Sequence, residues 1–592
     1  MVSQALCALL YIALCIGVAG LCSPRRQLQK SASLLLALSS AGEPQSTPHV
    51  VCIGAGFSGW GATRSLLAAG CKVTLLDAGN DPTGEVGTFT PSGKPFDAGT
   101  KGFWKDYPNV YFLLEDLKMD RSDVLTKCTN SSFYSPMGLE ATAPIFGDSP
   151  ILPSPLGQIA ASAALFERLP IIDRVSVAGL LLAILDLTPE TMRAYDLMTA
   201  RNLFDKFGLS KRLVDDFLRP TLLVGLFKPP EELSAAVVME LLYFYAMAHQ
   251  DAFDVCWIKS GSVASSFFLP LHKHLQSKYT DHYTVKSSSA VQEISVSDGR
   301  VTAVRFNTFD PLTKQITSNT VSPDGVVLAV GSKGLKAILS ESPGLAEASP
   351  MLTRAATMGS IDCIAVRLWL DQKLVTRSPA NVFANFPALR GSGGTFFMLD
   401  QLQPDEDALW AGQHEGNRGS VLACDFYNSG ALMSLSDDDI VKLLVQTLLP
   451  AAIPSYSSVH PVVLDSYVKR YPGAVNHFSP NTLDIRPRID VPSISNLKMA
   501  GDWVWMGDKE PKSKGLCQER AFVSGMEAAS AMLLRLNSQG LNVPTSGLPV
   551  LPVRPDESQV VIGRAVLKAV LDAVFGIPVL KNLGGLLWAS RE

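Results

Sequence analysis

The sequence predicts an α/β protein in which a parallel sheet, covered by helices, is assembled from separated stretches of the chain. Three observations predict this class. An apolar strand, a glycine turn, a helix and a second apolar strand follow one another over residues 50–77. Far downstream, a short strand ends in Gly501 and Asp502 and precedes a further helix. Hydrophobic residues make up 47% of the 592 residues, which supplies the core that several packed units need.

The first unit has the order of strand, turn, helix and strand that is typical of a dinucleotide-binding βαβ unit. Strands are expected over Val50–Ile53 and Lys72–Leu76, and a helix over Ser58–Ala69. The helix is expected to stop at Gly70, because glycine commonly follows the last helical residue. The sequence therefore predicts a Rossmann-type nucleotide site in this unit.

Each position of the glycine turn has an expected role. Gly54 makes the bend, Gly56 lets the backbone approach a pyrophosphate, and Gly59 lets helix and strand pack closely. The helix start at Phe57 and Ser58 supplies N–H groups and the positive end of the helix dipole, both of which favour a diphosphate.

Two acidic residues decide which dinucleotide is expected. Asp77 can accept hydrogen bonds from a ribose 2′-hydroxyl and would repel a 2′-phosphate, which favours FAD or NAD over NADP. The short strand before Gly501 and Asp502 is followed by a helix over Glu519–Leu536. A carboxylate and a helix start suit a ribityl chain and a phosphate, and an NAD domain does not need them. FAD is therefore the expected cofactor.

Composition excludes several other classes of protein. The net charge is −4 and no basic tract is present, so no nucleic-acid partner is expected. The ten cysteines include no Cys-x-x-Cys pair, and the seven outside the leader are expected to be reduced thiols. Neither a metal site nor a disulfide framework is predicted.

Residues 1–46 are expected to be a targeting presequence. The apolar run Ala5–Leu21 is too short for a comfortable membrane span. Arg25, Arg26 and the Ser-rich stretch Ser31–Ser40 follow it, and no acidic residue precedes Glu43. This pattern resembles the bipartite presequence of plastids reached through the secretory route. A plain secretory signal and an uncleaved membrane anchor are the alternatives.

Several downstream blocks carry a family resemblance. They are Asp97-x-Gly99-x-x-x-Phe103-x-x-x-Tyr107-Pro108-Asn109, Arg367-Leu-Trp-Leu-Asp371, Leu435-Ser-Asp-Asp-Asp-Ile, Arg486-Pro487 and Ala500-Gly501-Asp502-Trp503. Together with the glycine turn they resemble the FAD-dependent amine oxidase superfamily. Within it, they are similar to the plant and cyanobacterial carotene desaturases. The similarity extends over about residues 48–536.

The resemblance implies a reaction and a set of site residues. A hydride passes from a C–H bond to flavin N5, a proton leaves the neighbouring carbon, and a quinone re-oxidises the flavin. The substrate implied is an apolar polyene or isoprenoid in a dry channel. Gly84, Gly99, Arg486 and the strand starting at Val291, whose backbone contacts the adenine in this superfamily, join the cofactor-binding set. Lys101 replaces a family histidine beside the flavin ring, where its charge would stabilise the anionic reduced ring.

Two other functions stay open. One is an amine oxidase or another isoprenoid redox enzyme of the same fold, including a carotene isomerase. The other is a flavin-binding protein without turnover, which is kept because Lys101 departs from the family pattern. A second departure supports it, since Glu85 stands where the family has a basic residue after its second glycine motif.

The chain is expected to divide into seven stretches. They are the presequence 1–46, FAD-binding parts at 47–125, 257–345 and 485–536, a helical substrate region at 126–256, a substrate-domain sheet at 346–484, and a linker and tail at 537–592. The apolar helices Val175–Leu187 and Leu233–Ala248 are candidate channel walls or ordinary core. The tail over Val560–Trp588 is expected to be amphipathic, either touching a membrane surface or packing on the body.

Overall fold

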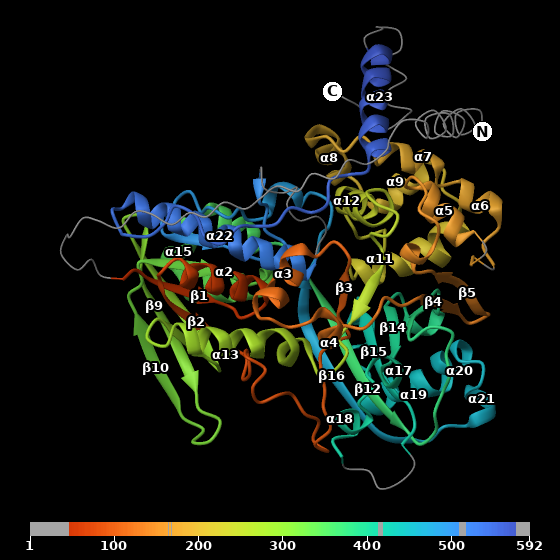
Figure 1. The fold of residues 1–592 in the computed structure, drawn as a ribbon, viewed down its shortest axis with the longest axis horizontal. Helices are drawn as coiled ribbons and strands as arrows, with labels where there is room; N and C mark the ends of the chain where they lie inside the picture. Colours follow the sequence, from red (N-terminus) through yellow and green to blue (C-terminus); the bar gives the residue numbers. More distant parts are fainter. Residues whose placement is uncertain (1–46, 164, 167, 413–417, 508–516, 576–592) are drawn as a thin grey trace.

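A computed structural model describes residues 47–163, 165–166, 168–412, 418–507 and 517–575 (Figure 1). The expected presequence and the end of the expected tail helix lie outside the described residues. No helix among the described residues is long and apolar enough to cross a membrane.

A five-stranded parallel sheet forms the centre of the predicted nucleotide domain. Its strands are β17 (Leu497–Met499), β11 (Gly325–Leu328), β1 (His49–Ile53), β2 (Lys72–Leu76) and β7 (Tyr283–Lys286), in that spatial order. They come from all three stretches assigned to the FAD-binding domain. Residues 50–53 are all buried, as expected for a parallel strand covered on both faces.

Two helices pack along this sheet at unusually close range. Figure 1 shows α2 (Phe57–Ala68) and α22 (Gln518–Ser538) lying together over the strands. A Cβ added to Gly525 would lie 1.9 Å from the carbonyl oxygen of Ser58, and one added to Gly61 would lie 2.5 Å from the carbonyl oxygen of Phe522. Only glycine fits at both positions, so these two residues set the distance between the helices.

A seven-stranded sheet forms the second body of the chain. Its order is β16 (Val463–Asn476), β12 (Ser360–Leu370), β15 (Val421–Tyr427), β14 (Gly393–Met398), β13 (Ala380–Phe383), β4 (Ser131–Ser135) and β5 (Gly138–Ala143). The strands β4 and β5 belong to the stretch 126–256, which the sequence predicts to be mainly helical. The difference arises because β4 reads Ser-Ser-Phe-Tyr-Ser and has too few apolar residues to be recognised.

A bend at Ser288, whose φ is +48°, separates the parallel sheet from a second group of strands. Before the bend, β7 joins the parallel sheet. After it, β8 (Ser289–Ser297) pairs with β9 (Arg300–Phe309), and β9 pairs in turn with β10 (Ile316–Val321). Residues 298–299 form the turn between β8 and β9.

The helical region lies at one end of the molecule. The apolar run expected as one helix over Val175–Leu187 is divided between α6 (Ile171–Val175) and α7 (Ala178–Ala183). The second expected helix is α12 (Ala235–Ala246). The tail helix α23 (Ser558–Phe575) stands at the same end, where its Arg564 donates to the Tyr243 hydroxyl on α12 (Figure 1).

Candidate active site

The start of α2 is open in the way a diphosphate requires. Its N-cap residue, Gly56, has extended backbone, and among the described residues no side chain caps the helix. A Cβ added to Gly56 would meet no atom within 4 Å, whereas one added to Gly59 would lie 1.8 Å from the carbonyl oxygen of Gly54. Gly54 itself has a φ of +102°, which favours glycine. The turn and helix start around Phe57 and Ser58 therefore fit a pyrophosphate group.

Asp77 directly follows β2 and stabilises the glycine turn through hydrogen bonds to its carboxylate. Its carboxylate accepts hydrogen bonds from the N–H of Ala55 at 2.6 Å and of Gly79 at 2.7 Å. The carbonyl of Asp77 accepts the N–H of Ser289 at 2.7 Å. This bond brings the start of β8 alongside the acid, so Val291 lies two residues from it along the strand.

The loop around Gly84 is stabilised by an acid that the sequence did not single out. The Asp81 carboxylate accepts the N–H groups of Gly84, Glu85, Val86 and Gly87 at 2.9, 3.0, 3.1 and 2.7 Å. A Cβ added to Gly84 would lie 2.5 Å from the backbone carbonyl carbon of Ala264. Gly84 is therefore required for the packing of the loop, and its N–H group is already hydrogen-bonded to protein.

The Gly501–Asp502 turn lies between β17 and the start of α22. Gly501 has a φ of +148° and donates its N–H to Ser524 Oγ at 2.9 Å. Burial raises the pKa of Asp502, an effect opposed by the charges of Arg520 and Arg486. Because Asp502 follows β17 closely, its carboxylate lies at the edge of the five-stranded sheet where the parallel strands end.

Two buried arginines fix the backbone of this turn. Arg486 donates from Nε to the carbonyl of Trp503 at 2.8 Å, and Arg520 donates from Nε to the carbonyl of Asp502 at 2.6 Å. Arg520 is fully buried, and sequence reasoning missed it. Its only sequence signal is a basic residue in the first turn of a helix, where the dipole disfavours a positive charge.

A cavity of about 360 Å³ lies between the nucleotide domain and the seven-stranded sheet. One side is formed by residues 98–102 and by Cys517 and Gln518 at the start of α22. The other sides come from β12, β15, α12 and α11 (Arg219–Gly225). Aromatic and aliphatic side chains dominate the wall: Trp104, Phe133, Val224, Phe227, Leu241, Tyr245, Phe253, Val255, Trp257, Ile364, Val382, Phe397, Tyr427 and Tyr471.

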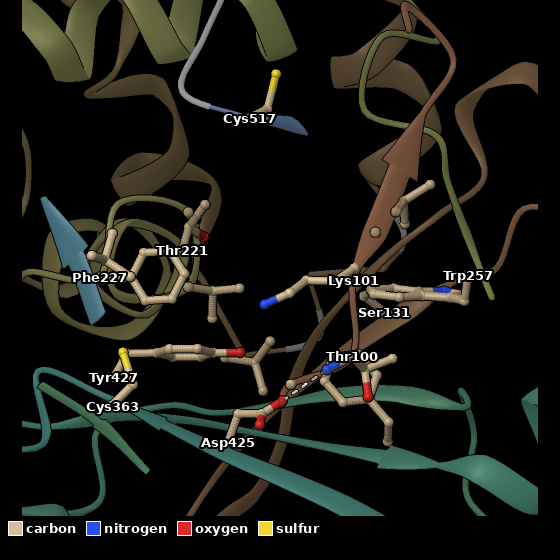
Figure 2. A pocket seen from close by; sticks show the side chains of 18 of the residues that line it. Thr100, Lys101, Ser131, Thr221, Phe227, Trp257, Cys363, Asp425, Tyr427 and Cys517 are labelled. Atoms are coloured by element: carbon tan, nitrogen blue, oxygen red, sulfur yellow. Dashed lines mark hydrogen bonds between the residues drawn. The ribbon is translucent and has the colours of Figure 1, made fainter. Parts of the chain in front are cut away.

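Lys101 and Asp425 bring charge into this apolar space. Figure 2 shows the Lys101 amino group pointing into the cavity, above the Asp425 carboxylate and near the Tyr427 ring. Asp425 accepts the N–H of Thr100 at 3.2 Å. A Cβ added to Gly99 would lie 3.3 Å from Lys101 Nζ and 3.5 Å from Asp425 Oδ1, so Gly99 leaves room for both groups.

Burial changes the pKa of Asp425. It raises the pKa of Asp425 to about 6, against the opposing effects of Lys101, the Thr100 N–H and Arg367. Arg367 is a buried residue of β12, and its Nη2 donates to the carbonyl of Asp97 at 3.5 Å. Its Nε has no hydrogen-bond partner among the described residues. Burial lowers the pKa of Arg367.

Asp425 was not among the residues that the sequence predicted for the site. A signal was present, because this carboxylate interrupts the apolar strand Val421–Tyr427, all of whose residues are buried. A buried charge is costly unless it is compensated or used, which makes it a candidate functional group.

Comparisons with known proteins match most of the chain. The family described as flavin containing amine oxidoreductase matches residues 57–533. The 15-cis-phytoene desaturase of Glycine max is 25% identical over 524 residues, 86% of this chain and 85% of that protein. A carotenoid phi-ring synthase of Streptomyces griseus is 24% identical over 522 residues, 84% of this chain and 91% of that protein.

Solved structures of the same fold include more distant proteins. A cyclohexylamine oxidase from Brevibacterium oxydans has a TM-score of 0.55 at 14% identity, covering 83% of this chain and 100% of that one. A putative protoporphyrinogen oxidase from Exiguobacterium has a TM-score of 0.54 at 14% identity and the same coverage. The expected fold class and the expected resemblance are confirmed. The chain therefore belongs to the flavin-containing amine oxidoreductase family and is an FAD-dependent oxidoreductase.

Proposed function

We propose that this enzyme removes hydrogen from an apolar polyene or isoprenoid, as a carotene desaturase does. The observation that carries this proposal is the cavity, whose walls are almost entirely aromatic and aliphatic and whose two charged groups, Lys101 and Asp425, lie together beside Gly99. A hydrocarbon needs apolar walls to be held and oriented. The names of the phytoene desaturases among the relatives support the same substrate class.

The proposed cofactor contacts are the residues that the sequence singled out. They are Gly54, Gly56, Phe57, Ser58, Gly59, Asp77, Gly84, Gly99, Val291, Arg486, Gly501 and Asp502. The open start of α2 and the space at Gly56 support the pyrophosphate position. When bound, FAD supplies the group that accepts the hydride. Arg486 is proposed to act through the backbone that directly follows the Gly501–Asp502 turn, because its guanidinium donates to the carbonyls of Trp503 and Val504.

Asp425 is proposed to accept the proton that leaves the carbon next to the one losing hydride. Its carboxylate faces the cavity, and its raised pKa makes it a stronger base than an exposed aspartate. Lys101 is proposed to hold a positive charge beside Gly99, where it would stabilise the negative charge that a bound flavin gains when it accepts the hydride. Removing one hydride and one proton from neighbouring carbons leaves a new double bond.

An amine substrate is the second candidate, and the cavity disfavours it. A primary amine is protonated at neutral pH; Asp425 would attract its charge, but Lys101 beside that acid would repel it and the mainly apolar walls would not solvate it. The cyclohexylamine oxidase and putrescine oxidase among the solved structures share the fold, at 13–14% identity. A third candidate, flavin binding without turnover, makes no use of the Lys101–Asp425 pair.

An apolar surface at the helical end is proposed to touch a membrane in which the substrate dissolves. The most exposed large apolar residues there are Ile151 at 88%, Ile171 at 75% and Ile172 at 77%. The helix α23 adds an exposed row of Val561, Ile562, Val566 and Val570, while its Val560 and Leu567 pack on the body. Apolar patches on a soluble body mark interaction sites.

A plastid is the proposed location, with a quinone of the membrane as the electron acceptor. The presequence pattern and the chloroplastic phytoene desaturases among the relatives support the location. A lipid-soluble acceptor suits an enzyme whose substrate is also dissolved in the membrane.

Mixing the FAD-loaded protein anaerobically with candidate substrates tests the function. Phytoene or zeta-carotene is expected to bleach the absorption of oxidised flavin, because each donates a hydride. Cyclohexylamine and putrescine are tested alongside and are expected to leave it unchanged. Bleaching by an amine alone would select the amine oxidase, and no bleaching by any compound would select flavin binding without turnover.

The substitution Asp77→Ala is expected to weaken FAD binding by about 1–2 kcal/mol, because it removes acceptors of charged hydrogen bonds at the cofactor turn. Fluorescence titration with FAD measures the effect. Asp324→Ala is the matched control, since Asp324 accepts the His49 N–H at 2.7 Å at the start of β1, away from the glycine turn. Equal affinities for the Asp77 variant and the wild type would contradict the assigned contact.

Turnover is expected to rise with pH through about 6, because the Asp425 carboxylate forms only above its raised pKa. In Asp425→Asn this dependence is expected to disappear and the rate to fall about 10²–10⁴-fold. The folded state binds this proton more tightly than the unfolded state, so the stability of the wild type falls as pH rises from about 4 to about 6.

Asp425→Asn is therefore expected to lose this pH dependence of stability as well, which denaturant titrations at several pH values measure. Asp465→Asn serves as the control, because Asp465 pairs with Lys94 outside the cavity. A wild-type pH profile retained in the Asp425 variant would rule out the proposed base.

The double substitution Ile171→Ser and Ile172→Ser is expected to lower binding to phosphatidylcholine vesicles by about tenfold or more, from the lost burial of two apolar side chains. Flotation of vesicles with bound protein measures the fraction. Leu312→Ser, at a side chain 92% exposed in the turn between β9 and β10, is the control. Equal losses in both variants would argue against a localised membrane face.

A further inference from the structure

Two cysteine thiols that the proposed chemistry does not use meet behind the cavity wall. The Sγ atoms of Cys128 and Cys256 are 3.2 Å apart, although 128 positions separate them in the sequence. Cys256 is 3% exposed, and Cys128 is half-buried at the surface. A thiol pair at this distance can be joined by a small movement, since a disulfide has an S–S distance of about 2.05 Å.

The backbone holds the two thiols opposite each other. Cys256 is the middle residue of β6 (Val255–Trp257). The segment containing Cys128 runs alongside, with Thr126 N–H donating to the Trp257 carbonyl at 2.8 Å and Thr129 N–H donating to the Val255 carbonyl at 3.1 Å. These bonds lie on both sides of the pair, so the thiols face each other as a consequence of strand register.

A guanidinium group favours the thiolate of Cys256. Arg121 Nη2 lies 3.5 Å from Cys256 Sγ, and its guanidinium stacks 3.7 Å from the centroid of the Tyr111 ring. The hydrogen bond from Cys128 and the charge of Arg121 lower the pKa of Cys256, against the effect of burial. The thiolate is the nucleophilic form of cysteine, which makes Cys256 the attacking residue and Cys128 its partner.

We propose that Cys128 and Cys256 are a redox-active thiol pair that hydrogen peroxide converts into an intramolecular disulfide. The Cys256 thiolate attacks one peroxide oxygen, the O–O bond breaks, and the products are Cys256 sulfenic acid and hydroxide. The Cys128 sulfur then attacks the Cys256 sulfur, and the sulfenic hydroxyl leaves as water with the Cys128 proton. Two thiols lose two electrons in total, and the peroxide is reduced to the level of water.

The position of the pair couples it to the cavity. Val255 and Trp257, the neighbours of Cys256, both line the cavity. Cys256 itself is paired with Phe103 on the adjacent strand β3 (Gly102–Trp104). The disulfide ties the surface segment carrying Cys128 to this wall. The modification depends on these two thiols and on Arg121, and it does not depend on which substrate the enzyme oxidises.

The test treats the full-length, FAD-loaded protein with hydrogen peroxide, alkylates the remaining thiols and maps peptides without reduction. A linked pair containing Cys128 and Cys256, two hydrogens lighter than the separate peptides, is expected and should be restored to thiols by dithiothreitol. The oxidised protein is expected to unfold at a temperature higher by on the order of a few degrees, because the link closes a long loop. Both cysteines recovered in alkylated form after peroxide would overturn the proposal.

Variants assign the two roles. In Cys128→Ser, the sulfenic acid on Cys256 is expected to accumulate and to be trapped by dimedone; in Cys256→Ser, Cys128 is expected to stay a thiol. Arg121→Gln is expected to slow oxidation roughly threefold or more, through loss of thiolate. Cys363→Ser is the control and leaves the disulfide yield unchanged, because burial raises the pKa of Cys363 to about 12. Sulfinic acid at Cys256 of the wild type without a link to Cys128 would also overturn the proposal.

Discussion

The close contact between α2 and α22 is the constraint on which the active site depends. Gly61 and Gly525 allow the backbones of the two helices to approach to a distance that any side chain at these positions would prevent. One helix carries the glycine turn at residues 54–59, and the other begins beside Gly501 and Asp502. Residues separated by more than 400 positions thereby become the two sides of the proposed cofactor site. The same contact positions Cys517 and Gln518 in the wall of the cavity.

A second constraint is the balance of charge in a cavity that excludes most polar groups. Asp425 is buried, and an isolated carboxylate there would cost several kcal/mol. Lys101, the Thr100 N–H and Arg367 offset part of this cost, and the remainder appears as the raised pKa of the acid. The residual imbalance would make Asp425 a base of useful strength in the proposed reaction. A fully paired aspartate would have an ordinary or lowered pKa and would hold a proton poorly.

Local patterns were sufficient to predict the nucleotide domain. The boundaries of β2 were predicted as found, and those of β1, α2 and α22 within two residues, because the apolar runs end next to Gly54 and Gly70 in two of them and next to polar residues in the others. The long strand β16 was not predicted, since it contains Pro472 and Gly473, which usually interrupt strands. It tolerates them because it is the edge of its sheet, where a missing N–H donor leaves no partner unpaired.

The candidate site was predictable only where its residues belong to a contiguous pattern. Lys101 and Gly99 were found because they follow one another in a recognisable block. Asp425 joins them from a strand more than 300 positions away, and its proximity depends on how the two bodies of the chain pack. The meeting of Cys128 and Cys256 likewise follows from strand register, which no spacing in the sequence reveals.

The short ribbon of β3 and β6 connects these features physically. Gly102 begins β3 directly after Lys101, and a Cβ on it would lie 2.7 Å from Val255 Cγ2, so the two strands are in close contact at the cavity. Successive side chains of a strand point to opposite faces. On β6, Val255 and Trp257 therefore face the substrate cavity while Cys256 faces the second thiol. A single strand thus separates the proposed substrate cavity from the proposed redox-active thiol pair. A shift in the backbone of β6 would therefore move side chains both at the cavity and at the thiol pair.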